Sequence, residues 1–75
     1  MNALPNLQRD YALAEAESCE ASAKASRLHA SVHLHPENGA GSIASAEASA
    51  NSAQVLTALA LQWRAHAALC GATPS

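Results

Sequence analysis

The stretch "HPENGAG", residues 35–41, divides the chain near its middle. Pro36 pushes the residue before it out of the helical region, and Gly39 and Gly41 favour a turn. The segments on either side are rich in Ala, Leu, Glu, Gln and Lys and are free of interior Pro and Gly, a composition that favours helix. We therefore predict an all-α fold, an antiparallel two-helix hairpin.

The expected helices also have suitable first residues. Pro5 falls in a first helical turn, where proline is tolerated, and Ser42 is a good N-cap. The predicted organisation is one domain over residues 1–75, with helices over about 5–34 and about 42–70 and a loop over 35–41.

The first helical segment carries apolar and small residues at alternating spacings of three and four, the pattern of a coiled-coil seam. The second has a comparable stripe, but the first half of the segment, "SIASAEASANSAQ", offers no apolar side chain larger than Ala after Ile43. A seam of Ala and Ser lets two helix backbones approach closely; the alternative is that this stretch is a solvated helix surface. The residues expected in a dimer or hairpin seam are Leu7, Tyr11, Ala14, Ser18, Ala21, Ala25, Leu28, Ala50 and Ala53.

The supply of large apolar side chains is small. Twenty residues are Ala, and the bulky set is nine Leu, two Val, one Ile, Trp63 and Tyr11. A core of this size leaves a monomer marginal. The second helix also projects Ile43, Leu61 and Leu69 on sides that one hairpin partner does not cover. We therefore predict a homodimer that forms a four-helix bundle.

The charge balance argues against nucleic-acid binding, because four Lys and Arg against six Asp and Glu give a formal charge of -2 without a basic run. No segment reaches the ~18 uncharged apolar residues that a membrane span needs. The first residues lack the basic and apolar regions of a signal peptide. We expect a cytoplasmic protein without nucleic-acid or membrane partners.

Three histidines near the end of the first helix form the nearest approach to a metal motif: His29, His33 and His35. His29 and His33 share a helical face at a spacing compatible with zinc, but no nearby Cys and no His-Glu-x-x-His pattern accompanies them. Imidazoles at a helix C-terminus also suit the helix dipole. We expect no metal and no cofactor, with a His-based metal-binding protein as the remaining alternative.

Catalysis is not expected either. Cys19 and Cys70 lie about 13 residues apart along the hairpin, roughly 20 Å at 1.5 Å per residue, which is too far for an intrachain disulfide. Neither Cys has a His or Asp arrangement around it that suits nucleophilic catalysis. No phosphate-binding loop occurs, and a two-helix chain has no obvious concave site.

The function class that remains is binding to another protein. Helix-in-groove recognition uses apolar residues one helical turn apart, and Trp is a frequent interface anchor. The expected protein-binding residues are apolar anchors with a polar rim: Leu56, Leu59, Trp63, Arg64 and His66. Trp63 serves equally well in a hairpin or dimer core.

In outline, a short, motif-free, slightly acidic helical hairpin is similar to small accessory proteins of phages and mobile elements that block a host protein. It is also similar to hairpins that dimerise into four-helix bundles. The likeness rests on size and periodicity and transfers no residue. It implies a non-enzymatic regulator or inhibitor that occupies a surface of a larger host protein, or a structural or assembly module whose main contact is with itself.

Overall fold

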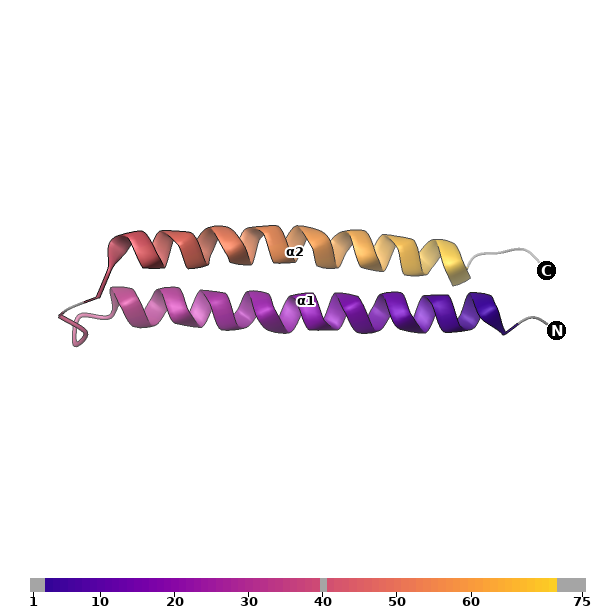
Figure 1. Ribbon diagram of the computed structural model, residues 1–75, viewed down its shortest axis with the longest axis horizontal. Coiled ribbons are helices and arrows are strands. Elements are labelled where there is room, and N and C mark those ends of the chain that lie inside the picture. Colours follow the sequence, from indigo (N-terminus) through magenta and orange to yellow (C-terminus); the bar gives the residue numbers. More distant parts are fainter. Residues whose placement is uncertain (1–2, 40, 72–75) are drawn as a thin grey trace.

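Two long helices account for almost the whole chain. The computed structural model describes residues 3–39 and 41–71. Helix α1 spans Leu4–Leu34 and helix α2 spans Ile43–Gly71, and they run antiparallel, side by side along their length (Figure 1). The described residues contain no strand, so the predicted all-α antiparallel hairpin is confirmed.

The hairpin is a rod. Its Cα atoms extend over 60 × 13 × 11 Å, and the radius of gyration is 17.2 Å. A compact domain of the same length has a radius of gyration of about 11 Å. A rod encloses little volume for its surface, so few side chains can be covered on all sides.

The loop between the helices forms as the sequence predicts, with Pro36 after the end of α1 and Ser42 before the start of α2. His35 takes an extended conformation, with φ -66° and ψ 134°, and Pro36 follows it. The Asn38 side chain donates to the carbonyl of Val32 at 3.0 Å and so satisfies one of the last carbonyls of α1. At the start of α2, the Ser42 hydroxyl accepts the backbone N–H of Ser45 at 3.2 Å, as an N-cap does.

Gly41 has a steric role in this loop. A Cβ at Gly41 would overlap the backbone carbonyl of His33, whereas a Cβ at Gly39 would meet nothing within 4 Å. The chain therefore passes so close to the last turn of α1 that position 41 cannot carry a side chain without a backbone shift.

The core between the helices consists of alanine. Among the described residues eight are buried, and all eight are alanines: Ala12, Ala16, Ala23, Ala30, Ala46, Ala53, Ala60 and Ala67. In α2 they recur at every seventh residue, and in α1 Ala16, Ala23 and Ala30 do the same. We call this line of residues the alanine seam. Half-buried residues alternate with it: Cys19, Ser26 and His33 in α1, and Ser49, Leu56, Trp63 and Cys70 in α2.

The hairpin seam predicted for α1 was on the wrong face. Leu7, Tyr11 and Leu28 are 63%, 60% and 58% exposed. The smaller residues of the same stripe are exposed as well: Ala14, Ser18, Ala21 and Ala25. In α2, Ala53 is buried as predicted, but Ala50 is exposed. A role of this outer stripe in a dimer stays a prediction.

The sequence led to the wrong face because α1 has two stripes with the same three-and-four spacing. One carries the larger side chains, and the other carries alanine at every seventh residue. The alanine repeat of α2 can come close only to a partner face that is equally small, so α1 turns its alanine stripe inward. Close approach brings backbone atoms into contact, and alanine loses no side-chain entropy on burial.

The alanine seam leads to a first prediction. Replacing Ala53 by Leu should lower the free energy of unfolding by about 1–3 kcal/mol, because three extra carbon atoms do not fit between closely packed helices. Ala50→Leu is the matched control, since the same change at an exposed site should stay within about 0.5 kcal/mol. Urea unfolding followed by circular dichroism measures both. Equal effects at the two positions would contradict the described seam.

Candidate protein-binding surface

The rod has two long flanks, one on each side of the alanine seam, and they differ in charge. In a coiled coil, the positions next to the seam on one helix face the equivalent positions of its partner. On one flank, Arg64 makes a two-pronged ion pair with Glu20: Nη2 donates to Oε1 at 2.6 Å, and Nε donates to Oε2 at 3.0 Å. The seven-residue repeat places most of the charged residues on this charged flank: Asp10, Glu17, Glu20, Lys24, Arg27, Glu47 and Arg64.

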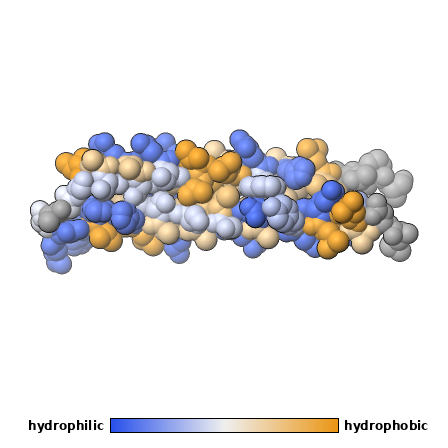
Figure 2. All heavy atoms as spheres, viewed as in Figure 1, coloured by the Kyte–Doolittle hydropathy of each residue, from blue (hydrophilic) through white to orange (hydrophobic). Residues whose placement is uncertain are grey.

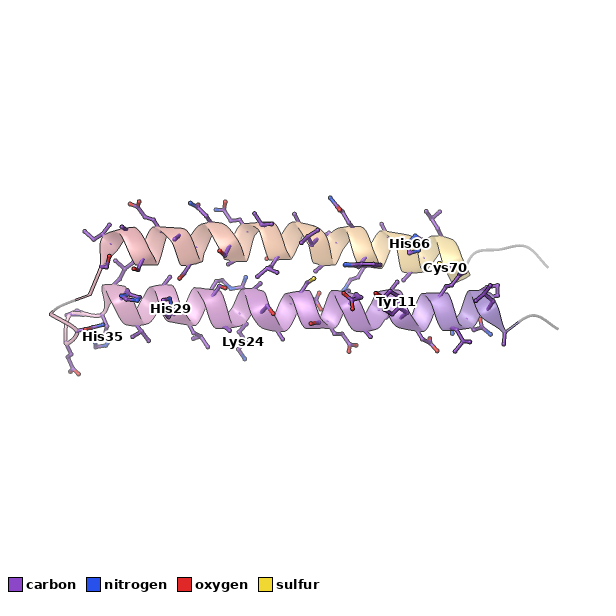
Figure 3. The ribbon with its side chains drawn as sticks, viewed as in Figure 1. Tyr11, Lys24, His29, His35, His66 and Cys70 are labelled. Carbon is purple, nitrogen blue, oxygen red and sulfur yellow. The ribbon has the colours of Figure 1, made fainter. Side chains whose placement is uncertain are left out.

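The opposite flank carries the aromatic rings. Tyr11 of α1 meets Trp63 of α2 edge to face, with ring centroids 5.7 Å apart and planes at 90°. Trp63 in turn lies 6.2 Å from the ring of His66. Figure 3 shows Tyr11 and His66 at the open end of the hairpin and His29 nearer the loop. The residues of this aromatic flank are Tyr11, Glu15, Ser18, Ser22, Ala25, His29, Val32, Ser45, Ala48, Ser52, Val55, Leu59, Gln62, Trp63, His66 and Leu69. Glu15 is the one carboxylate among these described residues.

The large apolar side chains lie outside the seam. Among the described residues no large side chain is fully buried. The exposed large ones are Leu4, Leu7, Tyr11, Leu28, Val32, Leu34, Ile43, Val55, Leu59, Leu61 and Leu69. Figure 2 shows apolar side chains at several places along the rod, separated by polar ones. The surface thus carries the apolar groups that a globular domain would place in its core.

The five predicted binding residues do not lie on one surface. Leu59 and His66 are exposed on the aromatic flank, and with Gln62 and the half-buried Trp63 they line a shallow hollow. Leu56 is half-buried beside the alanine seam. Arg64, expected as their polar rim, lies on the charged flank in its ion pair with Glu20. The structure therefore brings together Leu59, Trp63 and His66.

The ion pair shifts the titration of both partners. The hydrogen bonds from Arg64 lower the pKa of the Glu20 carboxyl below its ordinary value of 4.5. The same contact raises the pKa of the Arg64 guanidinium. Both side chains remain nearly half exposed, and solvent screens such pairs strongly. The pair therefore joins residues that lie level across the seam and adds only modestly to the stability of the fold.

Two of the three predicted histidines form a chain of hydrogen bonds. The backbone N–H of Ser42 donates to His33 Nδ1 at 3.3 Å, and His33 Nε2 lies 3.2 Å from His29 Nε2. His29 Nδ1 then reaches the Ser49 hydroxyl of α2 at 2.7 Å. His35 stands apart, because its Nδ1 accepts the backbone N–H of Glu37 at 3.1 Å. The expected cluster is thus a pair, and it is tied to the second helix.

Both cysteines are half-buried thiols. Cys70 Sγ lies 3.6 Å from His66 Nε2, one helical turn away on α2. Within residues 3–39 and 41–71, no group of three or more His, Cys, Asp or Glu side chains gathers where it could hold a metal ion. In the same residues, no helix has both the length and the apolar character needed to cross a membrane.

Comparison of the chain with known protein families, with curated proteins and with solved structures gives no match. The proposed function therefore rests on the geometry of the surface.

The ion pair leads to a pH-dependent prediction. Because folding lowers the pKa of Glu20, its contribution to stability is present above pH 4.5 and is lost as the pH falls from 4.5 through the lowered value. We expect the difference between the unfolding midpoints in urea of the parent protein and of Glu20→Gln to be largest at pH 7 and to shrink as the pH falls below 4.5. Arg64→Gln removes the partner and should converge with the parent in the same way. A difference that stays constant as the pH falls from 7 to well below 4.5 would mean that Glu20 acts through packing.

Proposed function

We propose that this protein works by binding a larger protein through the aromatic flank. The single observation that carries the proposal is the inverted placement of apolar groups, with alanine inside the rod and Leu, Val, Ile and Tyr on its surface. Exposed apolar area that is rimmed by polar residues marks interaction sites in soluble proteins.

The amount of exposed surface supports the proposal. The chain has 5395 Å² of accessible surface. A compact monomer of 7.7 kDa has about 4,300 Å². The excess, about 1,100 Å², exceeds the ~800 Å² that each partner contributes to an interface of standard size.

The distribution of charge favours the aromatic flank over the charged one. The centres of protein interfaces are depleted of charged residues and enriched in aromatic ones. Glu15 is the one carboxylate among the described residues of the aromatic flank, whereas the charged flank holds seven charged side chains. A partner that covers the aromatic flank therefore has little charge to desolvate.

The open end of the aromatic flank has the character of an anchor. Tyr11 supports the Trp63 ring from the other helix, so the position of the indole is fixed before a partner arrives. Leu59, which is exposed, stands beside it one turn away. Fixed aromatic groups lose little conformational entropy on binding, and such residues contribute most of the affinity in many interfaces.

The same proposal extends to the kind of protein. A short rod whose surface hollows are shallow suits a regulator or inhibitor that acts by covering a partner surface, in the manner of small accessory proteins of phages and mobile elements. Helix-in-groove docking, in which apolar residues one turn apart enter a partner, is the mode that fits Leu59 and Trp63.

Two leucines of α2 allow a matched test. Leu59 lies on the aromatic flank and Leu61, also exposed, on the charged flank. The bound protein is first captured from the source cells with the intact chain and identified by mass spectrometry. Its affinity for each variant is then measured by calorimetry. We expect Leu59→Ala to weaken binding by about 2 kcal/mol and Leu61→Ala to change it by less than about 0.5 kcal/mol.

The control is the helical circular dichroism of each variant, which should equal that of the parent because neither leucine is in the seam. Equal losses of affinity for Leu59→Ala and Leu61→Ala would contradict docking through the aromatic flank. A loss confined to Leu61→Ala would move the binding surface to the charged flank.

A second candidate function, self-association as a structural or assembly module, is favoured by a separate observation. The outer face of α1 carries an apolar stripe with coiled-coil spacing, and Leu7, Tyr11 and Leu28 of that stripe are more than half exposed. A second copy that packs against this stripe would form the four-helix bundle that the sequence predicts, and the excess surface would be buried between copies.

Sedimentation equilibrium tests self-association. We expect a dimer at micromolar concentration, and Leu28→Glu should raise the dimer dissociation constant at least tenfold because the carboxylate would be desolvated in the interface. Leu34→Glu is the matched control: Leu34 is 60% exposed, close to the 58% of Leu28, but lies outside the apolar stripe, in line with Glu20 and Arg27 of the charged flank. A parent protein that is monomeric and unfolds cooperatively would contradict this candidate.

A further inference from the structure

His29 and His33 lie one turn apart on α1, and their Nε2 atoms are 3.2 Å apart. The rings meet at 71° with centroids 4.5 Å apart. We propose that this pair is a binding site for a divalent transition metal ion of the zinc type, held between the two Nε2 atoms. The site lies at the loop end of the aromatic flank, and it is independent of the protein-binding function proposed above.

The spacing of the two nitrogens suits the ion. Zinc binds histidine nitrogen at about 2.0–2.1 Å in tetrahedral geometry, so two of its nitrogen ligands lie about 3.3 Å apart. The observed 3.2 Å differs from this by about the tolerance of such sites. The ion would replace the hydrogen bond that now joins the rings, with a rotation of the two side chains that turns both Nε2 lone pairs toward it. Imidazole ligands favour zinc, copper and nickel over magnesium or calcium.

The second helix supplies the support that metal-binding histidines usually have. His29 Nδ1 lies 2.7 Å from the Ser49 hydroxyl of α2. With its proton on Nδ1, the ring donates to Ser49 and presents an unprotonated Nε2 to the ion. Such outer hydrogen bonds fix the ring orientation and strengthen the ligand. The sequence alone favours no metal at these histidines, and this contact, which depends on the register of the hairpin, is the reason to propose one.

Binding changes the protonation of His33 in a defined way. The backbone N–H of Ser42 can only donate, so His33 Nδ1 accepts it, and the neutral ring carries its proton on Nε2. When the ion binds Nε2, that proton passes through solvent to Nδ1, and the ring stays neutral. The Ser42 N–H then loses its acceptor. At 3.3 Å this is the longest contact of the chain of hydrogen bonds, and because the Nδ1–H and the Ser42 N–H are then both donors, the two groups must separate, which opposes binding.

Two coordination positions of a tetrahedral ion remain for water or for groups of a bound protein. His29 is exposed and His33 is half-buried, so the ion would be open on one side. No third histidine, cysteine or carboxylate joins the pair within the described residues. A site with two protein ligands binds reversibly, and we infer an exchangeable ion whose binding follows the free metal concentration.

One other pair could take the same ion. His66 and Cys70 are also one turn apart, with Nε2 and Sγ separated by 3.6 Å. The two pairs lie at opposite ends of the rod, so a test must tell them apart. The Cys70→Ser background removes the thiolate ligand of the second pair and leaves His29 and His33 unchanged.

The experiment is a calorimetric titration of zinc into the full chain in the Cys70→Ser background. Three variants are compared: the background itself, the same chain with His33→Gln, and the same chain with His35→Gln. We expect the dissociation constant to rise at least tenfold with His33→Gln and to stay within twofold with His35→Gln, because His35 points its Nδ1 at the Glu37 backbone. Ser49→Ala should weaken binding about tenfold through the lost outer hydrogen bond.

Nuclear magnetic resonance of the imidazole nitrogens gives a readout that does not depend on stability. Zinc should shift the Nε2 resonances of His29 and His33 together and leave those of His35 in place, while magnesium at the same concentration should shift none. The proposal is overturned if zinc binds the His33→Gln variant within twofold of the background. It is also overturned if the Nε2 resonances of His29 and His33 do not move.

Discussion

Close contact between two helices that carry alanine at every seventh residue is the constraint on which the rest of this structure depends. A methyl group loses no side-chain entropy on burial and holds the helices less far apart than a leucine would. The contact gains little from the hydrophobic effect per residue, because alanine removes little apolar area from water. Most of the larger apolar side chains among the described residues are excluded from the seam and lie on the surface of the rod, whereas Leu56 and Trp63 are half-buried beside it.

Once the seam is fixed, the positions on either side of it are fixed too. The seven-residue repeat sends Glu20 and Arg64 to one flank and Tyr11 and Trp63 to the other. Charged side chains then meet water on the charged flank, whereas the aromatic flank presents rings and small residues. One hairpin thus has two surfaces of different chemistry without a third helix or a sheet.

The hairpin could be predicted from the sequence because Pro36 and the two glycines interrupt an otherwise uniform helical composition, and these signals are local. The face on which the helices meet could not be chosen in the same way. In α1 the stripe of Leu7 and Tyr11 offers more area than the stripe of Ala16 and Ala23, and reasoning from area selects the larger one. The seven-residue alanine repeat, present in both helices, was the signal that identifies the seam.

The histidine pair and the protein-binding surface show the same division between local and long-range information. The i, i+4 pairing of His29 and His33 is readable in the sequence, but their partners Ser42 and Ser49 depend on the register of the hairpin. Arg64 was misplaced because its flank, too, follows from the phase of the seam. A seam made of methyl groups leaves a thin margin of stability, so any protein that covers the aromatic flank should also stabilise the hairpin by mass action.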